Sequence, residues 1–296
     1  FHGEDALLQK HYVSKRSRRQ KGILAFLAQD GDKRFFCYAN TDLRKEQQDD
    51  EILQFVKFWK RRTGKLPEEL IFDSKLTTYA NLNKLDRQGV QFITLRRRGP
   101  KLVQELLAQP RGAWRRIELD GVSRIYRTPR ILEQQVTLTD YAKPIRQIAI
   151  TELGHEQPTL LLTNQMRRSA AKLIGRYARR MLIENNIADG VNFFHMDALS
   201  SAVAMKVNCD LQLTLMGSSL YRLMAKRLAE PYQRATAKTI YNSLLDVGGL
   251  VDIQKKSITV TLDKRAHNPF LVDSGLADVP GPIRWLGGRT LEIRFA

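Results

Sequence analysis

Residues 70–95 read LIFDSKLTTYANLNKLDRQGVQFITL, and this stretch decides the fold class that we expect. An apolar segment over 70–72 ends at Asp73, a helical pattern follows over 77–88, and a second apolar segment occupies 90–95. This order predicts a β-α-β unit with an acid at the carboxyl end of its first strand. Because open α/β sheets bind ligands at that edge, Asp73 is a candidate site residue. An Asp in this position also caps the next turn frequently, so that interpretation stays open.

The composition narrows the class of partner. The 296 residues include 49 Lys and Arg against 31 Asp and Glu, which gives a formal charge of +18. Such a balance is typical of proteins that bind nucleic acid, because cationic side chains neutralise phosphates and release counterions. A ribosomal or membrane-surface role is the competing explanation, but no apolar run approaches the roughly 18 residues of a membrane span. Cys37 and Cys209 have no metal-ligand spacing, so we expect a reducing, cytoplasmic protein without a zinc site.

A second informative stretch, 176–186, reads RYARRMLIENN. Tyr177, Arg180 and Glu184 are spaced i, i+3 and i+7, so one continuous helix would carry all three on one face. Apolar residues share that face, and a charge there is costly unless a metal ion or a phosphate compensates it. The alternative interpretation is an Arg–Glu pair that lies along a helix, which is common.

The remaining patterns predict the order of the other elements. We expect residues 1–20 to be irregular, then two strands joined at Asp30-Gly31-Asp32, and a helix over about 49–63. Short alternating segments between Gly and Pro residues predict a β-rich insertion over 101–164. A helix that begins at Ser169 would then carry Glu184, because Ser is a good N-cap. Helical patterns and two final strands follow. The predicted parts are a first core part (1–98), the insertion (99–165), the last core part with a helical extension (166–240) and a strand-containing tail (241–296).

Together these stretches resemble the catalytic domain of DDE transposases of bacterial insertion sequences. The nearest branch is the insertion-sequence-four type, which carries a Tyr-Arg-Glu signature on its last catalytic helix. The resemblance covers roughly residues 22–271 and is carried by 71–79, 92–98, 176–186 and 193–199. It implies an α/β fold of the RNase H-like, retroviral-integrase-like kind: a mixed sheet flanked by helices, with a β-rich insertion before the last catalytic helix.

The resemblance also implies an activity and a cofactor. The family cleaves DNA at the ends of an insertion sequence and transfers the strands, with two Mg²⁺ or Mn²⁺ ions in the intact site. Asp73 and Glu184 would be metal ligands, and Arg180 would orient the carboxylate or bind a phosphate. Tyr177 would contact DNA by a phosphate or a displaced base, or it is part of the core. Val191 stands where the full signature has a Lys, which puts a lysine contact in doubt.

DNA is the expected partner, and a homodimer that joins two element ends in a synaptic complex is the expected assembly. The implied location is the bacterial cytoplasm, at the nucleoid. Two basic groups are candidates for contacts with the DNA backbone, although both would also suit a solvated surface. They are Lys15, Arg16, Arg18 and Arg19 near the start of the chain, and Arg96, Arg97 and Arg98 after the second strand.

The first acid of the resembled site is not evident. Three antiparallel strands precede the first helix in that fold, and the first catalytic Asp lies on the first of them. Since the patterns predict only two strands here, we expect the third strand and the Asp upstream of Phe1. Residues 1–296 would then bind DNA without cleaving it. Asp30 or Asp32 is the alternative if the strand count is wrong.

Two other functions stay open. One is a different RNase H-like nuclease, such as a junction resolvase, although resolvases are compact and lack a β-rich insertion. The other is a decayed, non-catalytic DNA-binding derivative of a transposase, which the net charge fits equally well.

Overall fold

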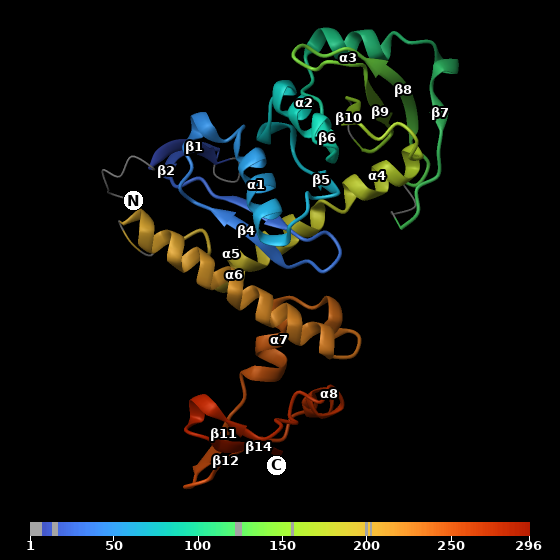
Figure 1. Cartoon of the computed structure of the whole chain (residues 1–296). Coiled ribbons are helices and arrows are strands. Elements are labelled where there is room, and N and C mark those ends of the chain that lie inside the picture. Colours follow the sequence, from blue (N-terminus) through green and yellow to red (C-terminus); the bar gives the residue numbers. More distant parts are fainter. Residues whose placement is uncertain (1–7, 14–16, 122–125, 155–156, 199–200, 202) are drawn as a thin grey trace. The chain divides into compact units, whose positions relative to one another are not determined.

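The computed structural model describes residues 8–13, 17–121, 126–154, 157–198, 201 and 203–296 (Figure 1). The protein is of the mixed α/β class, with a six-stranded mixed sheet and flanking helices. The chain forms two compact units. Among the described residues, the sheet unit comprises those from 8 to 31 and from 40 to 183, and the C-terminal unit comprises those from 32 to 39 and from 184 to 296.

The predicted β-α-β unit is confirmed. β5 (Glu69–Ile71) pairs in parallel with β6 (Gln91–Leu95), and α2 (Tyr79–Arg87) connects them. Thr78 caps α2, because its hydroxyl accepts a hydrogen bond from the Asn81 amide at 3.3 Å. Gly89 follows the helix with φ +78°, a conformation that favours glycine.

Beyond β6 the sheet continues through the insertion in the order β5-β6-β10-β9-β8-β7. All pairs after β5–β6 are antiparallel, so the sheet is mixed. The insertion strands are β7 (Arg115–Arg116), β8 (Arg130–Val136), β9 (Ile145–Thr151) and β10 (Thr159–Thr163).

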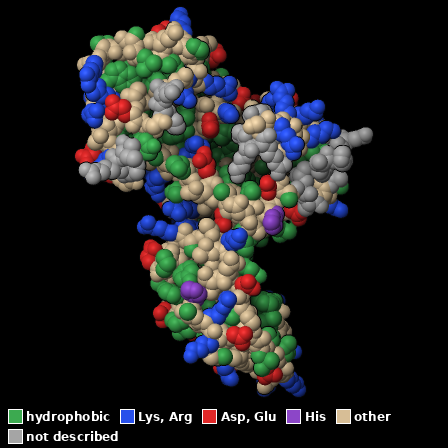
Figure 2. All heavy atoms as spheres, turned by 180° about the vertical axis from the view of Figure 1, so that it is seen from behind, with side chains coloured by type: hydrophobic (Ala, Val, Ile, Leu, Met, Phe, Trp, Pro, Cys, Tyr) green, Lys and Arg blue, Asp and Glu red, His purple; other side chains and the backbone are tan. Residues whose placement is uncertain are grey.

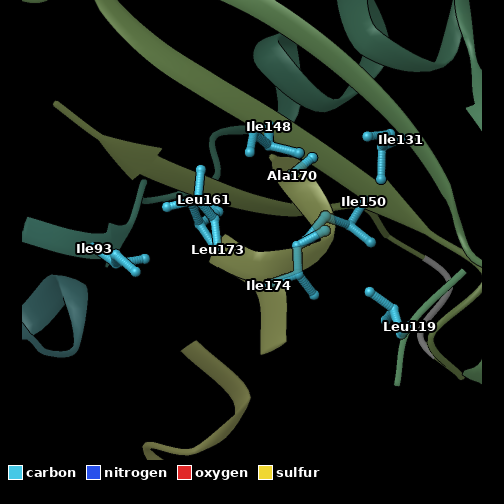
Figure 3. Packing of buried hydrophobic residues seen from close by; sticks show 9 residues of the cluster. All are labelled: Ile93, Leu119, Ile131, Ile148, Ile150, Leu161, Ala170, Leu173 and Ile174. Atoms are coloured by element: carbon cyan, nitrogen blue, oxygen red, sulfur yellow. The ribbon is translucent and has the colours of Figure 1, made fainter. Parts of the chain in front are cut away.

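One helix covers each face of the insertion strands. α4 (Ala170–Ala178) packs on one face, where alternate strand residues meet Leu173 and Ile174, which are buried (Figure 3). α3 (Pro100–Leu107) packs on the other face through Leu106, and Figure 1 shows the two helices on opposite sides of the sheet. The cluster under α4 consists of Ile93, Leu119, Ile131, Ile148, Ile150, Leu161, Ala170, Leu173 and Ile174.

α3 differs from expectation, because the β-rich insertion predicted over 101–164 included no helix. Its apolar positions, Leu102, Val103 and Leu106, are spaced i, i+1 and i+4, which suits one helical face. Pro100 at the first helical position and the Gly99 N-cap begin the helix. The apolar pattern of α3 covers only about two helical turns. Because it is so short, the Gly and Pro residues around it favoured the prediction of short strands.

The helix expected near 49–63 is α1 (Glu51–Thr63). Ile52, Phe55 and Val56 are buried on one face of this helix. Gly64 ends the helix with φ +75° and donates its backbone N–H to the Lys60 carbonyl.

The start of the chain also differs from expectation. Four strands precede α1 rather than two, and residues 9–22 contain an antiparallel pair instead of an irregular segment. The sequence of β2 does not alternate between apolar and polar residues, which is the pattern of a half-buried strand. Its cationic residues Arg18, Arg19 and Lys21 are all exposed. The four strands are β1 (Gln9–Val13), β2 (Arg18–Gly22), β3 (Phe26–Gln29) and β4 (Phe36–Asn40).

The C-terminal unit contains a long helix and a second mixed sheet. α6 (Ala204–Arg227) confirms the predicted helical extension, and the sheet order is β11-β12-β14-β13. Tyr232 and Leu244 are among the buried residues between helices and sheet. The other elements are α5 (Met181–Phe194), α7 (Ala237–Ile240), α8 (Asn268–Asp273), β11 (Gly249–Ile253), β12 (Ser257–Leu262), β13 (Pro282–Ile283) and β14 (Arg289–Phe295).

Among the residues that the structure describes, no helix combines the length and the apolar character that crossing a membrane requires.

Leu173 provides a test of the α4 packing. Its side chain is fully buried in the cluster against the sheet, so Leu173→Ala should lower the free energy of unfolding by about 2–5 kcal/mol. The control is Leu107→Ala at the end of α3, where the side chain is 56% exposed and a much smaller loss is expected. Urea unfolding of both variants measures the difference. Equal losses would contradict the packing described.

Candidate functional site

Asp73 lies at the carboxyl end of β5, two residues after the strand ends. Its Oδ1 accepts hydrogen bonds from the Ser74 hydroxyl at 3.1 Å and from the Lys75 backbone N–H at 3.3 Å. The half-buried carboxylate therefore caps the turn over 74–76, which is the structural role that the sequence left open. The same bonds orient the carboxylate at the sheet edge where a ligand is expected.

A pocket of about 300 Å³ opens beside Asp73, at the carboxyl ends of β5 and β6. Hydroxyl groups dominate its wall, and two acids and one Arg accompany them. Its volume is at the lower end of the range for ligand pockets. The lining residues are Asp49, Ser74, Thr77, Thr78, Tyr79, Leu82, Thr94, Leu95, Arg97 and Asp140.

Two oxygen atoms of the pocket wall are buried without a hydrogen-bond partner among the described residues. They are Oγ1 of Thr94, a residue that is 1% exposed, and Oδ1 of Asp49. A buried polar atom without a partner costs roughly 1–3 kcal/mol. Water or a ligand with donor groups would remove that cost, so the pocket floor suits a polar ligand.

Asp140 closes the pocket from the insertion and has a strained backbone, with φ +64°. The residues after it are bound to α2. The Ala142 backbone N–H donates to Oδ1 of Asn83 at 3.2 Å, and Lys143 Nζ lies 2.9 Å from Oδ2 of Asp86. These contacts hold the strained residue in place.

We call the contacts of Ala142 and Lys143 with α2 the clamp. The pKa values of Asp86 in the clamp and of Tyr141 beside it depart from their usual values. Burial raises the pKa of Asp86, but hydrogen bonds from Lys143 and Asn164 outweigh it, so the pKa lies below its usual value. Burial also raises the pKa of Tyr141, and the negative charge of Asp86 adds to that shift. Asp86 therefore stays ionised at neutral pH.

The three arginines after β6 have different roles. Arg96 Nη1 donates to Oε1 of the buried Gln147 at 2.7 Å, and Arg98 Nη1 donates to the Pro158 carbonyl at 3.3 Å. Arg97 is exposed and lines the pocket. Of this group, Arg97 is thus the side chain best placed to bind a ligand beside Asp73.

The helix expected to carry Tyr177, Arg180 and Glu184 is interrupted, which corrects the prediction of one continuous face. α4 ends at Ala178 and α5 begins at Met181. Arg180 lies in the turn, where its backbone N–H donates to the Tyr177 carbonyl at 2.9 Å. Neither Gly nor Pro occurs between 176 and 189, so no residue in the sequence marks the break.

Tyr177, Arg180 and Glu184 lie in three different parts of this region: at the end of α4, in the turn, and in α5. Tyr177 packs against the cluster under α4, and the Arg180 guanidinium carbon lies 5.5 Å from the centre of its ring. Glu184 is in the first turn of α5. Asp73 belongs to the sheet unit and Glu184 to the C-terminal unit, and their convergence on one metal site stays a prediction.

Two of the basic residues near the start of the chain, Lys15 and Arg16, lie outside the described residues. Arg18 and Arg19 are exposed on β2. Figure 2 shows Lys and Arg side chains spread over the visible face with Asp and Glu between them. Exposure leaves Arg18 and Arg19 available for DNA.

No protein-family model matches the chain, and no curated protein matches it. Within the described ranges there is no group of three or more His, Cys, Asp or Glu side chains arranged to hold a metal ion. The carboxylate of Asp73 with the Ser74 hydroxyl is a hard oxygen set of the type that suits Mg²⁺, and the two-ion site stays a prediction.

Of the ten residues that line the pocket, sequence reasoning selected only Arg97 as a site residue, and it missed the polar residues Asp49, Thr94 and Asp140 among others. The strand-edge rule that selected Asp73 applies equally to Thr94 near the end of β6 and would have found it. Asp49 and Asp140 are distant in sequence, and no local signal connects them with the edge.

The clamp predicts a pH effect on stability. The pKa of Asp86 is lower in the folded than in the unfolded chain, so its stabilising contribution is present above the unfolded value of 3.8 and is lost as pH falls through the lower folded value. Asp86→Asn should therefore lower the free energy of unfolding at pH 6, and the deficit should shrink below about pH 4. Urea unfolding at several pH values measures it, with Asp120→Asn at an exposed turn as control. A deficit that does not change with pH would contradict the assignment.

Proposed function

We propose that the protein is a DNA transposase that cleaves the ends of an insertion sequence and transfers the strands by metal-dependent phosphoryl transfer. The observation that carries this proposal is Asp73 beside a polar pocket at the carboxyl edge of β5 and β6. The net charge of +18 supports DNA as the substrate. We further propose that it acts as a homodimer on two element ends in the bacterial cytoplasm.

The finer fold proposal is an RNase H-like catalytic core with an inserted β-rich part. The β5–α2–β6 unit and the antiparallel strands added beyond β6 support it, because the insertion precedes α4 as in the resembled family. In the described sheet, β5 is an edge strand, and β1 and β2 form a separate pair. A strand paired with β5 would complete the RNase H-like arrangement.

The proposed chemistry distributes roles among the residues of this chain. Asp73 and Glu184 would hold the metal, and when bound the ions would activate the attacking oxygen and stabilise the leaving oxygen. Ser74 and the Lys75 N–H fix the Asp73 carboxylate through its Oδ1. The Arg180 guanidinium would bind a DNA phosphate through two parallel hydrogen bonds.

The position of the first acid belongs to the same proposal. Four strands precede α1 in the described part of the chain, but they pair only as β1–β2 and β3–β4, so none of them supplies the strand that would pair with β5. Asp30, Asp32 and a residue upstream are the alternatives. An acid within residues 1–296 would allow this stretch of chain to cleave DNA by itself.

Loss of either proposed metal ligand should abolish cleavage. Asp73→Asn and Glu184→Gln should each reduce Mg²⁺-dependent cleavage of a duplex that carries the DNA flanking the gene by at least about 100-fold. DNA affinity should change little, because neither residue is proposed to hold the backbone. Asp120→Asn is the control, and the same assay on Asp30→Asn and Asp32→Asn assigns the first acid.

An equal loss of cleavage and of DNA binding would count against a catalytic role for Asp73 and Glu184. DNA binding without cleavage, in a chain extended upstream as well, would favour the non-catalytic derivative.

The basic residues near the start of the chain should control the salt dependence of binding. Replacing Lys15, Arg16, Arg18 and Arg19 by Gln should weaken binding to all sequences alike. The slope of log K against log salt should flatten by about 0.9 for each lost phosphate contact. Binding to a short duplex of random sequence at several salt concentrations measures the slope, with Lys255→Gln and Lys256→Gln as control. An unchanged slope would show that the first group is solvated surface.

A further inference from the structure

Glu69 on β5 has a buried carboxylate whose side chain is 8% exposed. Three side chains donate to it. Gln165 Nε2 lies 2.8 Å and Arg168 Nη1 lies 2.7 Å from Oε1, and Arg176 Nε donates to Oε2. The two carboxylate oxygens therefore bind two different segments of the chain.

The donors lie on both sides of the start of α4. Gln165 and Arg168 precede Ser169, the N-cap of the helix, and Arg176 is in its last turn. The span from Ser169 to Arg176 is about two helical turns. A single carboxylate that binds both ends of this span fixes the position of α4 along its axis and its rotation about that axis.

A second residue holds the entry to α4. Arg146 on β9 donates through Nη1 to the Gln165 carbonyl at 3.0 Å and to the Arg168 carbonyl at 2.5 Å. Its Nε donates to Oε2 of Glu133 on β8 at 3.0 Å. The segment before the helix is thus held from the strand side, while Glu69 holds it together with the helix.

Apolar contacts, and not only this network, attach α4 to the sheet. Leu173 and Ile174 already bury the helix against the sheet. Buried ion clusters are often no more stabilising than apolar replacements, because both charges lose their hydration. What Glu69 adds to nondirectional apolar packing is direction, since each hydrogen bond requires a defined geometry.

The part of the chain fixed in this way carries two residues of the proposed site. Tyr177 follows Arg176 directly, and Arg180 lies over the Tyr177 ring at 5.5 Å. Because neighbouring helix residues differ by about 100° in direction, the rotation that Glu69 imposes through Arg176 also sets the direction of Tyr177.

We infer that Glu69 is a positioning residue: through Arg168 and Arg176 it sets the rotation of α4. That rotation fixes the Tyr177 ring, on which Arg180 lies, and so aims Arg180 at the DNA. The consequence for cleavage rests on the proposed transposase function. The consequence for the order of α4 does not.

Glu69→Gln tests the inference. A misplacement of about 1 Å costs on the order of 100-fold in rate, so single-turnover cleavage should fall by that factor while DNA affinity changes by less than about threefold. The matched control is Glu152→Gln, because Glu152 also binds two arginines, Arg116 at 3.4 Å and Arg130 at 3.0 Å, after β9. It should change cleavage little.

A double-mutant cycle separates positioning from a general structural defect. If Glu69 acts through Arg180, then Glu69→Gln combined with Arg180→Ala should cleave no more slowly than Arg180→Ala alone. Multiplied losses would overturn the inference. If Glu69→Gln does not fold, Arg176→Gln, which removes only one arm of the network, takes its place in the cycle.

Hydrogen exchange distinguishes failure of this inference from failure of the proposed function. Glu69→Gln should raise the exchange rates of the amides over 176–183 by roughly tenfold, and Glu152→Gln should leave them unchanged. An unchanged rate in Glu69→Gln overturns the inference whether or not the protein cleaves DNA. Raised rates in a protein that cleaves DNA neither as residues 1–296 nor when extended upstream would support the role of Glu69 in ordering α4 and reject the transposase.

Discussion

Leu70 of β5 pairs with Phe92 of β6 in a parallel ladder, and the candidate site depends on this pairing. Parallel neighbours require a crossover, which α2 supplies, and their carboxyl ends then meet at one edge of the sheet. Ser74, next to Asp73, therefore lines the same pocket as Thr94 and Arg97. An antiparallel hairpin with the same two strands would have put Asp73 and Thr94 at opposite ends.

The two groups of buried polar atoms in the sheet unit differ in how they are satisfied. Glu69 has three side-chain donors, which gives the start of α4 a defined geometry. Asp49 Oδ1 and Thr94 Oγ1, in contrast, are buried in the pocket wall without partners among the described residues. A fully bonded group favours rigidity, whereas an unsatisfied one favours the binding of something else. The Glu69 network thus suits a rigid structural role, and the pocket wall at Asp49 and Thr94 suits a binding site.

The high positive charge is not all available to a partner. Arg96, Arg146 and Arg168 donate hydrogen bonds to groups inside the sheet unit. Arg18, Arg19 and Arg97 are exposed instead. A DNA-binding surface therefore has to be defined from the exposed cations and not from the net charge, because internal cations contribute little to counterion release.

The sequence by itself determined the elements whose signals are local. The apolar runs around α2, the stripe of α1 and the Ser169 cap predicted these elements correctly, since periodicity and capping depend on neighbouring residues. Only the tertiary structure decided the rest. Asp49 and Asp140 reach the pocket through contacts between distant segments, and the break at Arg180 has no Gly or Pro to mark it. Such features arise from packing and hydrogen bonds between segments far apart in the chain, which no local pattern encodes.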